Sequence, residues 1–287
     1  MEKIHGTSAS LSFKHKTKTV DNTFVSDGIE IKYFSGGTKY DTFVKIFNES
    51  DLVTKFITMG LPIDKELKIF GESYGGKEQG MSHTYGTVGK FVAFDVRIND
   101  SWLNVPTAEN IVNNFGLEFV HYVKVSTDLK ELDAQRDAPS VQAIRNGITT
   151  KAEDGTLINP KKREGVIIRP LIELIKNNGN RVICKHKGDD FKETATPRPV
   201  VDPSKMKVLA ESKAIADEWV TVNRLKHVLQ RIPTHDMEKM KDIIATMLED
   251  VLRESSGEIV DSPTTRKAIS TKTAITYKDY LKSQIGK

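Results

Sequence analysis

Hydrophobic residues alternate with polar residues over two stretches near the start of the chain, residues 8–13 and 28–34. Such alternation is typical of strands with one buried face, so residues 1–44 are predicted to be β structure. Residues 45–59 carry apolar side chains at helical spacing before Gly60, which predicts a helix that ends there. Further strands are predicted at 67–72, 91–97, 118–125, 165–169 and 181–187. Helices are predicted near 107–115, in pieces within 126–147, and briefly between the last two strands.

The pattern changes at a polar, proline-rich segment, residues 192–205, which shows no apolar periodicity and is typical of a linker. From residue 208 apolar residues return at helical spacing, a second helix is predicted at 237–253, and the segment after Pro263 is weakly helical. We therefore predict an α+β protein in three parts. These are a domain of antiparallel sheets with flanking helices (1–195), a linker (196–206) and a small all-helical domain (207–287).

Composition narrows the classes of protein that this chain can be. Its 287 residues suffice for two domains, and 38% hydrophobic with 29% charged residues is typical of a globular protein with a core. No apolar run approaches the roughly 20 residues that cross a bilayer, and no signal-peptide pattern is present. The one cysteine, Cys184, excludes an internal disulfide and suits a reducing compartment, so we expect a cytoplasmic protein without membrane contact. A net charge of +4, from 43 basic and 39 acidic residues, permits a polyanionic partner without requiring one.

The first candidate for chemistry is Lys3, in the segment Lys3-Ile4-His5-Gly6. A lysine amine is a usable nucleophile when nearby positive charge favours loss of its proton. His5 lies two residues on, so in an extended segment both side chains point the same way. Gly6 lets the backbone approach a ligand closely. The alternative interpretation is a solvated lysine near a chain end.

Two later strands could supply a nucleotide pocket for this amine. Glu72 ends an apolar strand before two glycines, where a carboxylate can hold a sugar hydroxyl or a metal-bound water, although an ordinary strand end is the alternative. Phe94 could stack on a purine or be a core phenylalanine. Asp95, in mid-strand, needs a partner if it is buried.

The last two strands of the first domain carry charged residues of both signs. Glu164 precedes an apolar strand and fits a role in organising magnesium, directly or through water. Regular alternation along that strand puts Arg169 on the face opposite to Glu164. Lys185 and Lys187 share one strand face, where two ammonium groups can neutralise a triphosphate and make a nearby amine a better nucleophile. The alternative is an edge strand protected by lysines.

Together these segments resemble the nucleotidyl motifs of ATP-dependent RNA ligases. K-I-H-G-T, F-G-E-S-Y-G-G, F-V-A-F-D, E-G-V-I-I-R-P and I-C-K-H-K occur in the order of motifs I, III, IIIa, IV and V. The chain is most similar to the RNA ligase 2 family of the T-even bacteriophage type. Histidine after the nucleophile favours RNA ligases over DNA ligases and capping enzymes. The likeness continues through residues 220–224 and 247–254, which resemble the helical C-terminal domain of that family.

The resemblance implies an enzyme that uses ATP and Mg²⁺ (or Mn²⁺) to join a 3′-hydroxyl to a 5′-phosphate in nicked or bridged duplex RNA. Lys3 would form a lysyl-AMP, the AMP would pass to the RNA 5′-phosphate, and the 3′-hydroxyl would displace it. The implied catalytic residues are Lys3, His5, Glu164, Lys185 and Lys187, with Glu164 also holding the metal. The implied nucleotide-binding residues are Glu2, Lys3, Ile4, Glu72, Phe94, Glu164, Lys185 and Lys187, and Asp95 would support the strand of Phe94. The resemblance further implies RNA repair by a monomer, in the host cytoplasm if the protein is phage-encoded.

The helical domain carries a polar set of its own. Asp250 and Glu254 are four residues apart and share a helix face, and Arg224 lies on the preceding helix. The resemblance implies that these three residues bind RNA. A surface salt-bridge cluster is the alternative.

Three departures from the family pattern bear on activity. Ser8 stands where the family usually has asparagine, and the motif Ia arginine has no counterpart in residues 31–37, where Lys32 or Lys39 could substitute. Relatives also carry a supporting strand upstream of the nucleophile, so either the start is misassigned, or support comes from elsewhere, or the protein is impaired, and a lysine this close to a chain end risks fraying. A capping-type nucleotidyltransferase and a catalytically impaired, ligase-like RNA-binding protein therefore stay open as alternatives.

Overall fold

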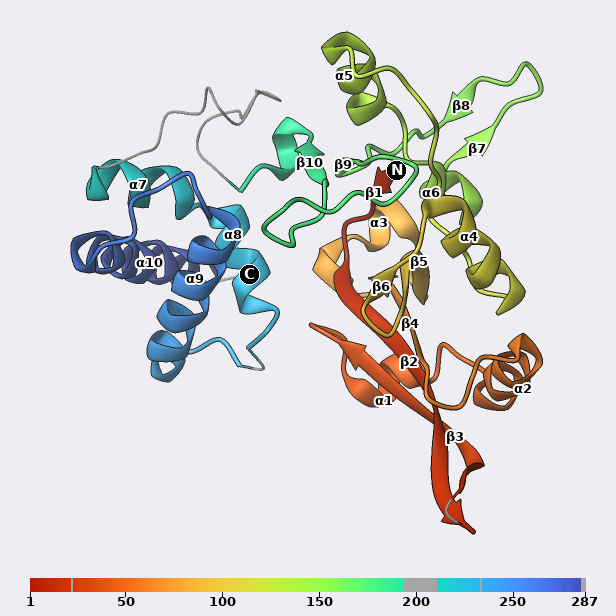
Figure 1. The fold of residues 1–287 in the computed structure, drawn as a ribbon. Coiled ribbons are helices and arrows are strands. Elements are labelled where there is room, and N and C mark those ends of the chain that lie inside the picture. The colour runs from red at the N-terminus through yellow and green to blue at the C-terminus, as the bar shows by residue number, and fades with distance from the viewer. Residues whose placement is uncertain (22, 194–210, 233, 285–287) are drawn as a thin grey trace. The chain divides into compact units, whose positions relative to one another are not determined.

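In the computed structural model the chain divides into two compact units, Met1–Lys187 and Gly188–Lys287 (Figure 1). The structure describes residues 1–21, 23–193, 211–232 and 234–284. The predicted linker, residues 196–206, lies outside the described residues. The fold class is α+β, as predicted, with antiparallel sheets and helices in the first unit and helices in the second. Every helix in the described part of the chain is too short or too polar to cross a membrane.

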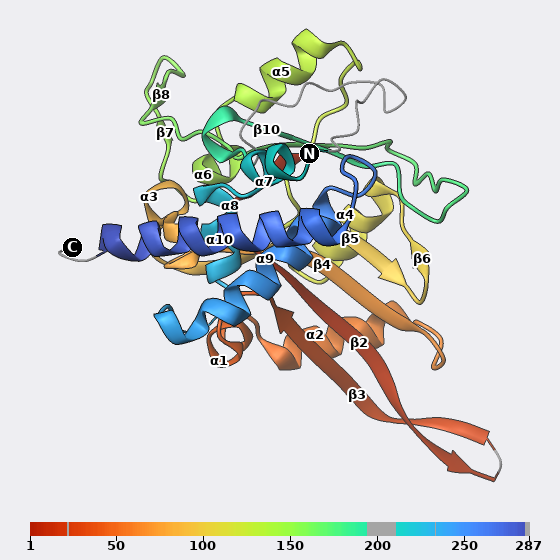
Figure 2. The ribbon, with the colours of Figure 1, turned by 90° about the vertical axis from the view of Figure 1, so that its left-hand side faces the viewer.

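A five-stranded antiparallel sheet, with strand order β3-β2-β4-β5-β6, dominates the first unit. Its strands are β2 (Thr7–Val20), β3 (Thr23–Ser35), β4 (Glu66–Gly75), β5 (Gly89–Ile98) and β6 (Ser101–Trp102). Leu11 and Phe13 of β2 are fully buried on one face, and the Phe13 ring stacks on Phe56 with ring centroids 5.6 Å apart. Three helices cover this face, namely α1 (Tyr40–Val44), α2 (Glu49–Met59) and α4 (Val105–Asn114). Strands β2 and β3 extend as a hairpin beyond the rest of the sheet (Figure 2).

A second, three-stranded antiparallel sheet brings the start of the chain together with segments from the end of the first unit. Its strands are β1 (Glu2–Lys3), β9 (Gly165–Ile168) and β10 (Cys184–Lys187), with β9 in the centre. Shorter elements of the unit are η1 (Glu78–Gly80), α3 (Ser82–Tyr85), α5 (Leu129–Asp137), α6 (Val141–Arg145), β7 (Thr150–Lys151) and β8 (Leu157–Ile158). This sheet therefore places the predicted nucleophile beside the motifs that contain Glu164 and Lys187.

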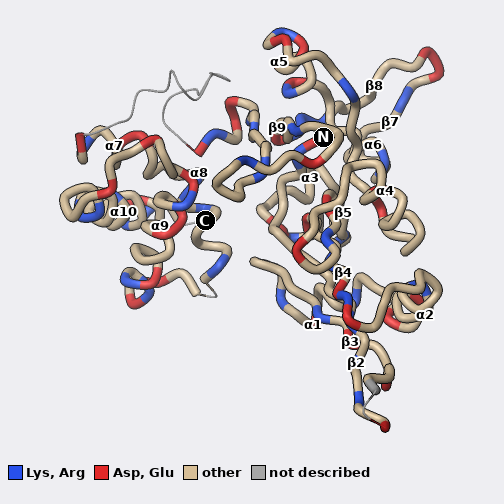
Figure 3. Tube along the Cα trace, in the orientation of Figure 1, with Lys and Arg blue, Asp and Glu red and all other residues tan. Residues whose placement is uncertain are grey.

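The second unit is helical around its own core. Its elements are η2 (Asp189–Phe191), α7 (Ser212–Trp219), α8 (Val222–Leu229), η4 (Met237–Lys239), α9 (Met240–Glu254) and α10 (Pro263–Gln284). Ile215, Leu225, Ile243 and Ile269 are fully buried in the core that these helices share. Basic and acidic residues are interspersed along both units (Figure 3), in keeping with the small net charge.

The predicted strand at residues 118–125 is wrong. Its only β-bridge among the described residues pairs Phe119 with Ala93 of β5. The amide of Ala93 donates to the carbonyl of Glu118 at 2.8 Å, and the amide of Glu2 donates to the carbonyl of His121 at 2.8 Å. The backbone of this segment hydrogen-bonds first to the five-stranded sheet and then to the three-stranded sheet. It therefore joins neither sheet as a regular strand, although its composition suits one.

Two further local predictions are wrong, and a third, the weakly helical segment after Pro263, is confirmed as a full helix. Residues 40–44 form helix α1 within the stretch predicted to be β. The segment after Pro263 is one continuous helix of 22 residues, because Ile269 and Tyr277 are buried against the other helices. Residues 170–183, all described, form two irregular arms joined by a turn where a short helix was predicted. The arms are held by a bridge between Ile175 and Arg181, since the Asn-Gly turn closes a hairpin.

Candidate active site

The start of the chain is held in place by strand pairing. Glu2 pairs with Val166 and Lys3 pairs with Gly165 on β9. The amide of Ile167 donates to the carbonyl of Met1 at 2.8 Å. The support for this segment therefore comes from β9, which satisfies its backbone groups and counters the risk of fraying.

Lys3 and Lys187 lie on opposite sides of one glycine. Both residues are paired with Gly165, Lys3 from β1 and Lys187 from β10, so the three form a row across the sheet. A Cβ atom at Gly165 would lie 2.2 Å from the carbonyl oxygen of His186, so a larger residue does not fit there. Side chains paired across strands share a face, so the two amines extend from the same side of the sheet.

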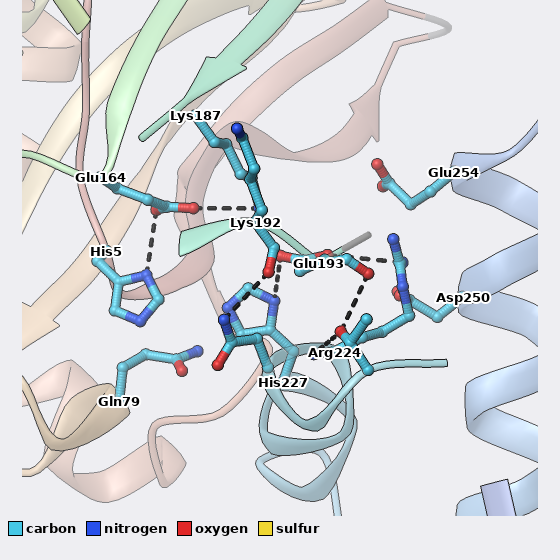
Figure 4. A network of polar contacts seen from close by, with 12 residues as sticks. His5, Gln79, Glu164, Lys187, Lys192, Glu193, Arg224, His227, Asp250 and Glu254 are labelled. Carbon is cyan, nitrogen blue, oxygen red and sulfur yellow. Dashed lines mark hydrogen bonds and ion pairs between the residues drawn. The ribbon is translucent and has the colours of Figure 1, made fainter. Parts of the chain in front are cut away.

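The Glu164 carboxylate binds both amines and a histidine. Figure 4 shows Glu164 with His5 and Lys187. Its Oε2 lies 2.7 Å from the Nζ of Lys3 and 3.2 Å from the Nδ1 of His5, and its Oε1 lies 3.2 Å from the Nζ of Lys187. The Glu164 side chain is only 1% exposed. Burial by itself raises the pKa of Glu164, but the charges of Lys3 and Lys187 and the hydrogen bond from His5 outweigh it, and the pKa is lowered. Glu164 is therefore a buried carboxylate that stays ionised and holds three nitrogens around it.

Glu72 is a second carboxylate close to the same group, and it responds in the opposite way. The pKa of Glu72 is raised to about 7, because burial and the negative charge of Glu164 together outweigh the positive charges of Lys3 and Lys185, which lower it. The amide of Gly6 donates a hydrogen bond to Glu72. A Cβ atom at Gly6 would lie 2.3 Å from the carbonyl oxygen of Ser73, so the motif glycine is needed for this close approach. The five-stranded and three-stranded sheets thus converge on one charged cluster.

The side chains of Asp95 and Arg169 are buried partners in one ion pair. Asp95 is buried, and its Oδ2 lies 3.1 Å from Arg169 and 2.5 Å from Arg181. Glu173 binds the same two arginines and lies 2.6 Å from the Nε of Arg181. Phe94, beside Asp95, is only partly buried, next to an irregularity in the pairing of β5 with β4. Arg169 therefore ties the strand of Phe94 to the end of β9.

Glu2 and Ile4 flank the predicted nucleophile but point elsewhere. The Glu2 carboxylate accepts hydrogen bonds from the Ser140 hydroxyl at 2.6 Å and from the amides of Val141 and Gln142 at 3.0 and 3.3 Å. It therefore caps the first turn of α6. Ile4 is buried in the core. The backbone of this segment is thus fixed on both sides of Lys3.

Several supporting residues were missed by the sequence analysis. The amide of His5 donates to the Tyr85 hydroxyl at 3.2 Å, and Gln79 donates to the carbonyl of Gly6 at 3.0 Å. Ser140 carries a weak signal, since serine before a helical piece is a common N-cap. Arg181 carries no local signal, because its partner Asp95 is 86 residues away in the chain.

The three predicted RNA-binding residues of the second unit form a cluster of their own (Figure 4). Arg224 is 2% exposed, and its Nη1 lies 2.6 Å from Asp250, which is also buried. Arg231 and Arg253 bind the other oxygen of the same carboxylate. Glu254 is partly exposed and lies 3.5 Å from Arg253. Arg224 and Asp250 therefore hold α8 against α9, while Glu254 lies at the edge of the cluster.

The carboxylates near Lys3 fit a magnesium ion that is held by one or two protein side chains and otherwise by water and phosphate oxygens. Among the described residues, no group of three His, Cys, Asp or Glu side chains is arranged to hold a metal. Magnesium commonly uses one or two carboxylates together with water and phosphate oxygens. Glu164 and Glu72 are two such carboxylates, near enough for the charge of Glu164 to act on Glu72.

Two antiparallel sheets that converge on a lysine bound by a buried carboxylate, followed by a helical unit, define an α+β protein with a nucleotidyltransferase-type domain. A family model described as RNA ligase matches residues 1–187, and the chain belongs to this family. RNA is therefore the substrate class, and ligation is the activity of the family. No curated protein matches the chain.

Proposed function

We propose that the protein is an ATP-dependent RNA ligase of the RNA ligase 2 type, which seals 3′-hydroxyl/5′-phosphate breaks in nicked or bridged duplex RNA. The observation that carries the proposal is the cluster of Lys3, His5 and Lys187 around the Glu164 carboxylate. A cluster of this kind positions an amine and gathers positive charge where a polyphosphate can bind.

Lys3 is the nucleophile. Its Nζ attacks the α-phosphorus of ATP, so that an N–P bond forms, the bond to the β-phosphate oxygen breaks and pyrophosphate leaves. The amine loses its proton to solvent. An oxygen of the RNA 5′-phosphate then takes the AMP from Lys3, and the 3′-hydroxyl of the other strand end displaces AMP to form the phosphodiester. In each step charge on phosphate oxygens must be neutralised, which is the main task of a protein in phosphoryl transfer.

The surrounding residues divide this work. Lys185 and Lys187 hold phosphate oxygens, and Glu164 orients Lys3 and His5. Glu72, with a pKa of about 7, can offer a sugar hydroxyl both a donor and an acceptor near neutral pH. Phe94, partly exposed on β5, stacks on adenine, while the backbone of Glu2 and Ile4 lies against the nucleotide. Glu164 and Glu72 would hold Mg²⁺ or Mn²⁺, which supplies charge neutralisation when bound.

The second unit serves the RNA. Glu254, at the edge of its cluster, contacts the RNA, and Arg224 and Asp250 fix the helices that present it. We further propose a role in RNA repair as a monomer in the cytoplasm, with residues 1–195 as the adenylyltransferase domain and 207–287 as the RNA-binding domain.

The test is covalent labelling of the protein with radiolabelled ATP or GTP in the presence of magnesium. Wild type is expected to take label from ATP as an acid-labile adduct, and Lys3→Ala and Lys3→Arg are expected to take none. Lys14→Ala, which removes an exposed lysine of the hairpin, is the matched control and should label normally. Labelling by GTP alone would identify a capping-type enzyme. RNA binding without any adduct would identify an impaired ligase, and labelling of Lys3→Ala would remove the central assignment.

A further inference from the structure

The five-stranded sheet has a second face, opposite the one that packs on helices α1, α2 and α4. On it, Ser10 of β2 is paired with Phe34 of β3 and with Phe70 of β4. The next row pairs Ser12 with Lys32 and Lys68, and Lys68 with Arg97 of β5. Residues paired across strands share a face, so aromatic and basic side chains gather here. We call this set the open-face surface: Lys32, Phe34, Lys68, Phe70, Arg97 and Trp102.

The open-face surface begins at the candidate active site. Ser8 is paired with Glu72; Ser8 lies two residues before Ser10 on β2, and Glu72 lies two residues after Phe70 on the antiparallel strand β4. Since side chains two residues apart on a strand point the same way, Glu72 belongs to the same face. The surface therefore leads away from the cluster at Lys3 toward the β2–β3 hairpin.

The basic residues of this surface lie over aromatic rings. The Nζ of Lys68 lies 5.1 Å from the ring centroid of Phe70, and the guanidinium of Arg97 lies 5.9 Å from Phe70 and 5.6 Å from Trp102. Among the described residues neither cation has a carboxylate partner, and the Nε of Arg97 is buried without a hydrogen bond. These two cations are thus held over aromatic rings and form no ion pair with a carboxylate in the described part of the chain.

The remaining two members are exposed. The Phe34 side chain is 57% exposed. Lys32 is exposed and has only a surface contact, at 3.4 Å, with Glu30. Such a surface pair contributes little and exchanges readily for another anion. An exposed ring beside cationic side chains is the arrangement with which proteins bind nucleic-acid strands, with bases on the ring and phosphates on the cations.

We propose that the open-face surface binds a strand of the RNA substrate and guides it toward Lys3. Phe34 stacks on a base or sugar, and Lys32, Lys68 and Arg97 contact phosphates. The occupant is RNA because the face offers positive charge and aromatic rings together. The mixed row of Glu30, Lys14 and Glu66 marks the outer limit of the surface. The inference rests on the proposed function, in that the strand held here is one whose end is joined at Lys3.

The experiment measures the affinity of the full chain for a nicked RNA duplex, without ATP, at several salt concentrations. The variants are Phe34→Ala, the double variant Lys32→Gln/Lys68→Gln, and the control Lys45→Gln. Lys45 is an exposed lysine at the end of α1, on the helix-covered side of the sheet. Loss of two phosphate contacts should reduce the slope of log affinity against log salt by about 2. Phe34→Ala should weaken binding at least about fivefold.

Each outcome decides the proposal. A reduced slope in the double variant but not in Lys45→Gln supports it, provided that thermal melting shows all variants folded. Equal slopes in all proteins overturn it, as does a Phe34→Ala variant that binds RNA like wild type but loses self-association, which would make the face a protein contact. ATP labelling of Lys3, measured in parallel, tests the proposed function separately, because labelling needs no RNA.

Discussion

Glu164 in the first unit and Asp250 in the second are both buried carboxylates that bind three basic side chains each. Around Glu164 the partners are two lysines and a histidine, and all three keep some exposure. Around Asp250 the partners are three arginines, of which Arg224 is almost completely buried. Lysine and histidine exchange protons, whereas arginine stays charged and its planar group fits a carboxylate in a fixed geometry.

The difference between the two clusters lies in what their cations can do. A lysine held at 2.7 Å from a carboxylate can be released, lose its proton and act on a ligand. Arginines clamped on a buried aspartate cannot act in that way, so their contribution is to the stability of the helical unit. Substitutions at four positions test this difference.

The largest effect on stability is expected for Asp250→Ala. It leaves Arg224 buried with only the longer 3.5 Å contact to Glu193, so we expect a loss of about 3 kcal/mol in the free energy of unfolding of the second unit. Urea denaturation followed by the fluorescence of Trp219, in a Trp102→Phe background, measures it. Asp242→Ala, on the same helix with an exposed partner at 3.6 Å, is the control and should change stability by less than about 0.5 kcal/mol. Equal losses would show that burial of the cluster does not matter.

Glu164→Ala is expected to reduce adenylation of Lys3 by about 10²–10³-fold, because the amine and its neighbours lose the carboxylate that positions them. Glu164→Gln, which keeps the shape of the side chain, should also be strongly impaired while it stays folded. Glu153→Ala, an exposed glutamate in the loop between β7 and β8, serves as the control. Single-turnover labelling with ATP measures the rate, and a normal rate in Glu164→Gln would contradict a role for the charge.

The titration of Glu72 should make the stability of the first unit depend on pH. Its pKa rises from an ordinary 4.5 to about 7, so between these values the folded chain binds more protons at Glu72 than the unfolded chain does. Stability must then fall as pH rises through this window, by up to about 3 kcal/mol. Glu164 contributes little to the slope over most of this window, because it is ionised in the folded state and, above its ordinary pKa of 4.5, increasingly in the unfolded state as well. Its stabilising contribution is lost as pH falls below that value.

The measurement compares wild type with Glu72→Gln by thermal or urea unfolding from pH 4.5 to 7.5. Other titrating groups are common to both proteins, so the difference between the two curves isolates Glu72. Parallel curves would mean that burial of Glu72 does not raise its pKa.

The smallest effect on stability is expected for Glu254→Gln. Its 3.5 Å contact with Arg253 is at the surface, so the free energy of unfolding should change by less than about 0.5 kcal/mol. Sealing of nicked RNA should nevertheless fall, while labelling of Lys3 by ATP stays normal, if this residue contacts RNA. Unchanged sealing would leave Glu254 without a role in the reaction.

Local pattern predicted the elements with strong periodicity or clear end signals. The helix predicted to end at Gly60 is confirmed as α2. Its last residue is Met59, and Gly60 follows in the left-handed conformation. The strands around Glu72 and Phe94 are confirmed as β4 and β5. Residues 118–125 were assigned to a strand because their composition suits one, but pairing depends on neighbours that the local sequence does not contain. Arg181 was missed for the same reason, since its role exists only beside Asp95.

The family, the α+β class and the residue types of the site follow from the amino-acid sequence, because an ordered set of short motifs and the apolar periodicity are both local features of the chain. Which charged side chains contact one another depends on the tertiary structure. The row of Lys3, Gly165 and Lys187 and the opposite pKa shifts of Glu164 and Glu72 depend on strand register and burial. Both are properties of contacts between segments far apart in the chain, and no local pattern encodes them.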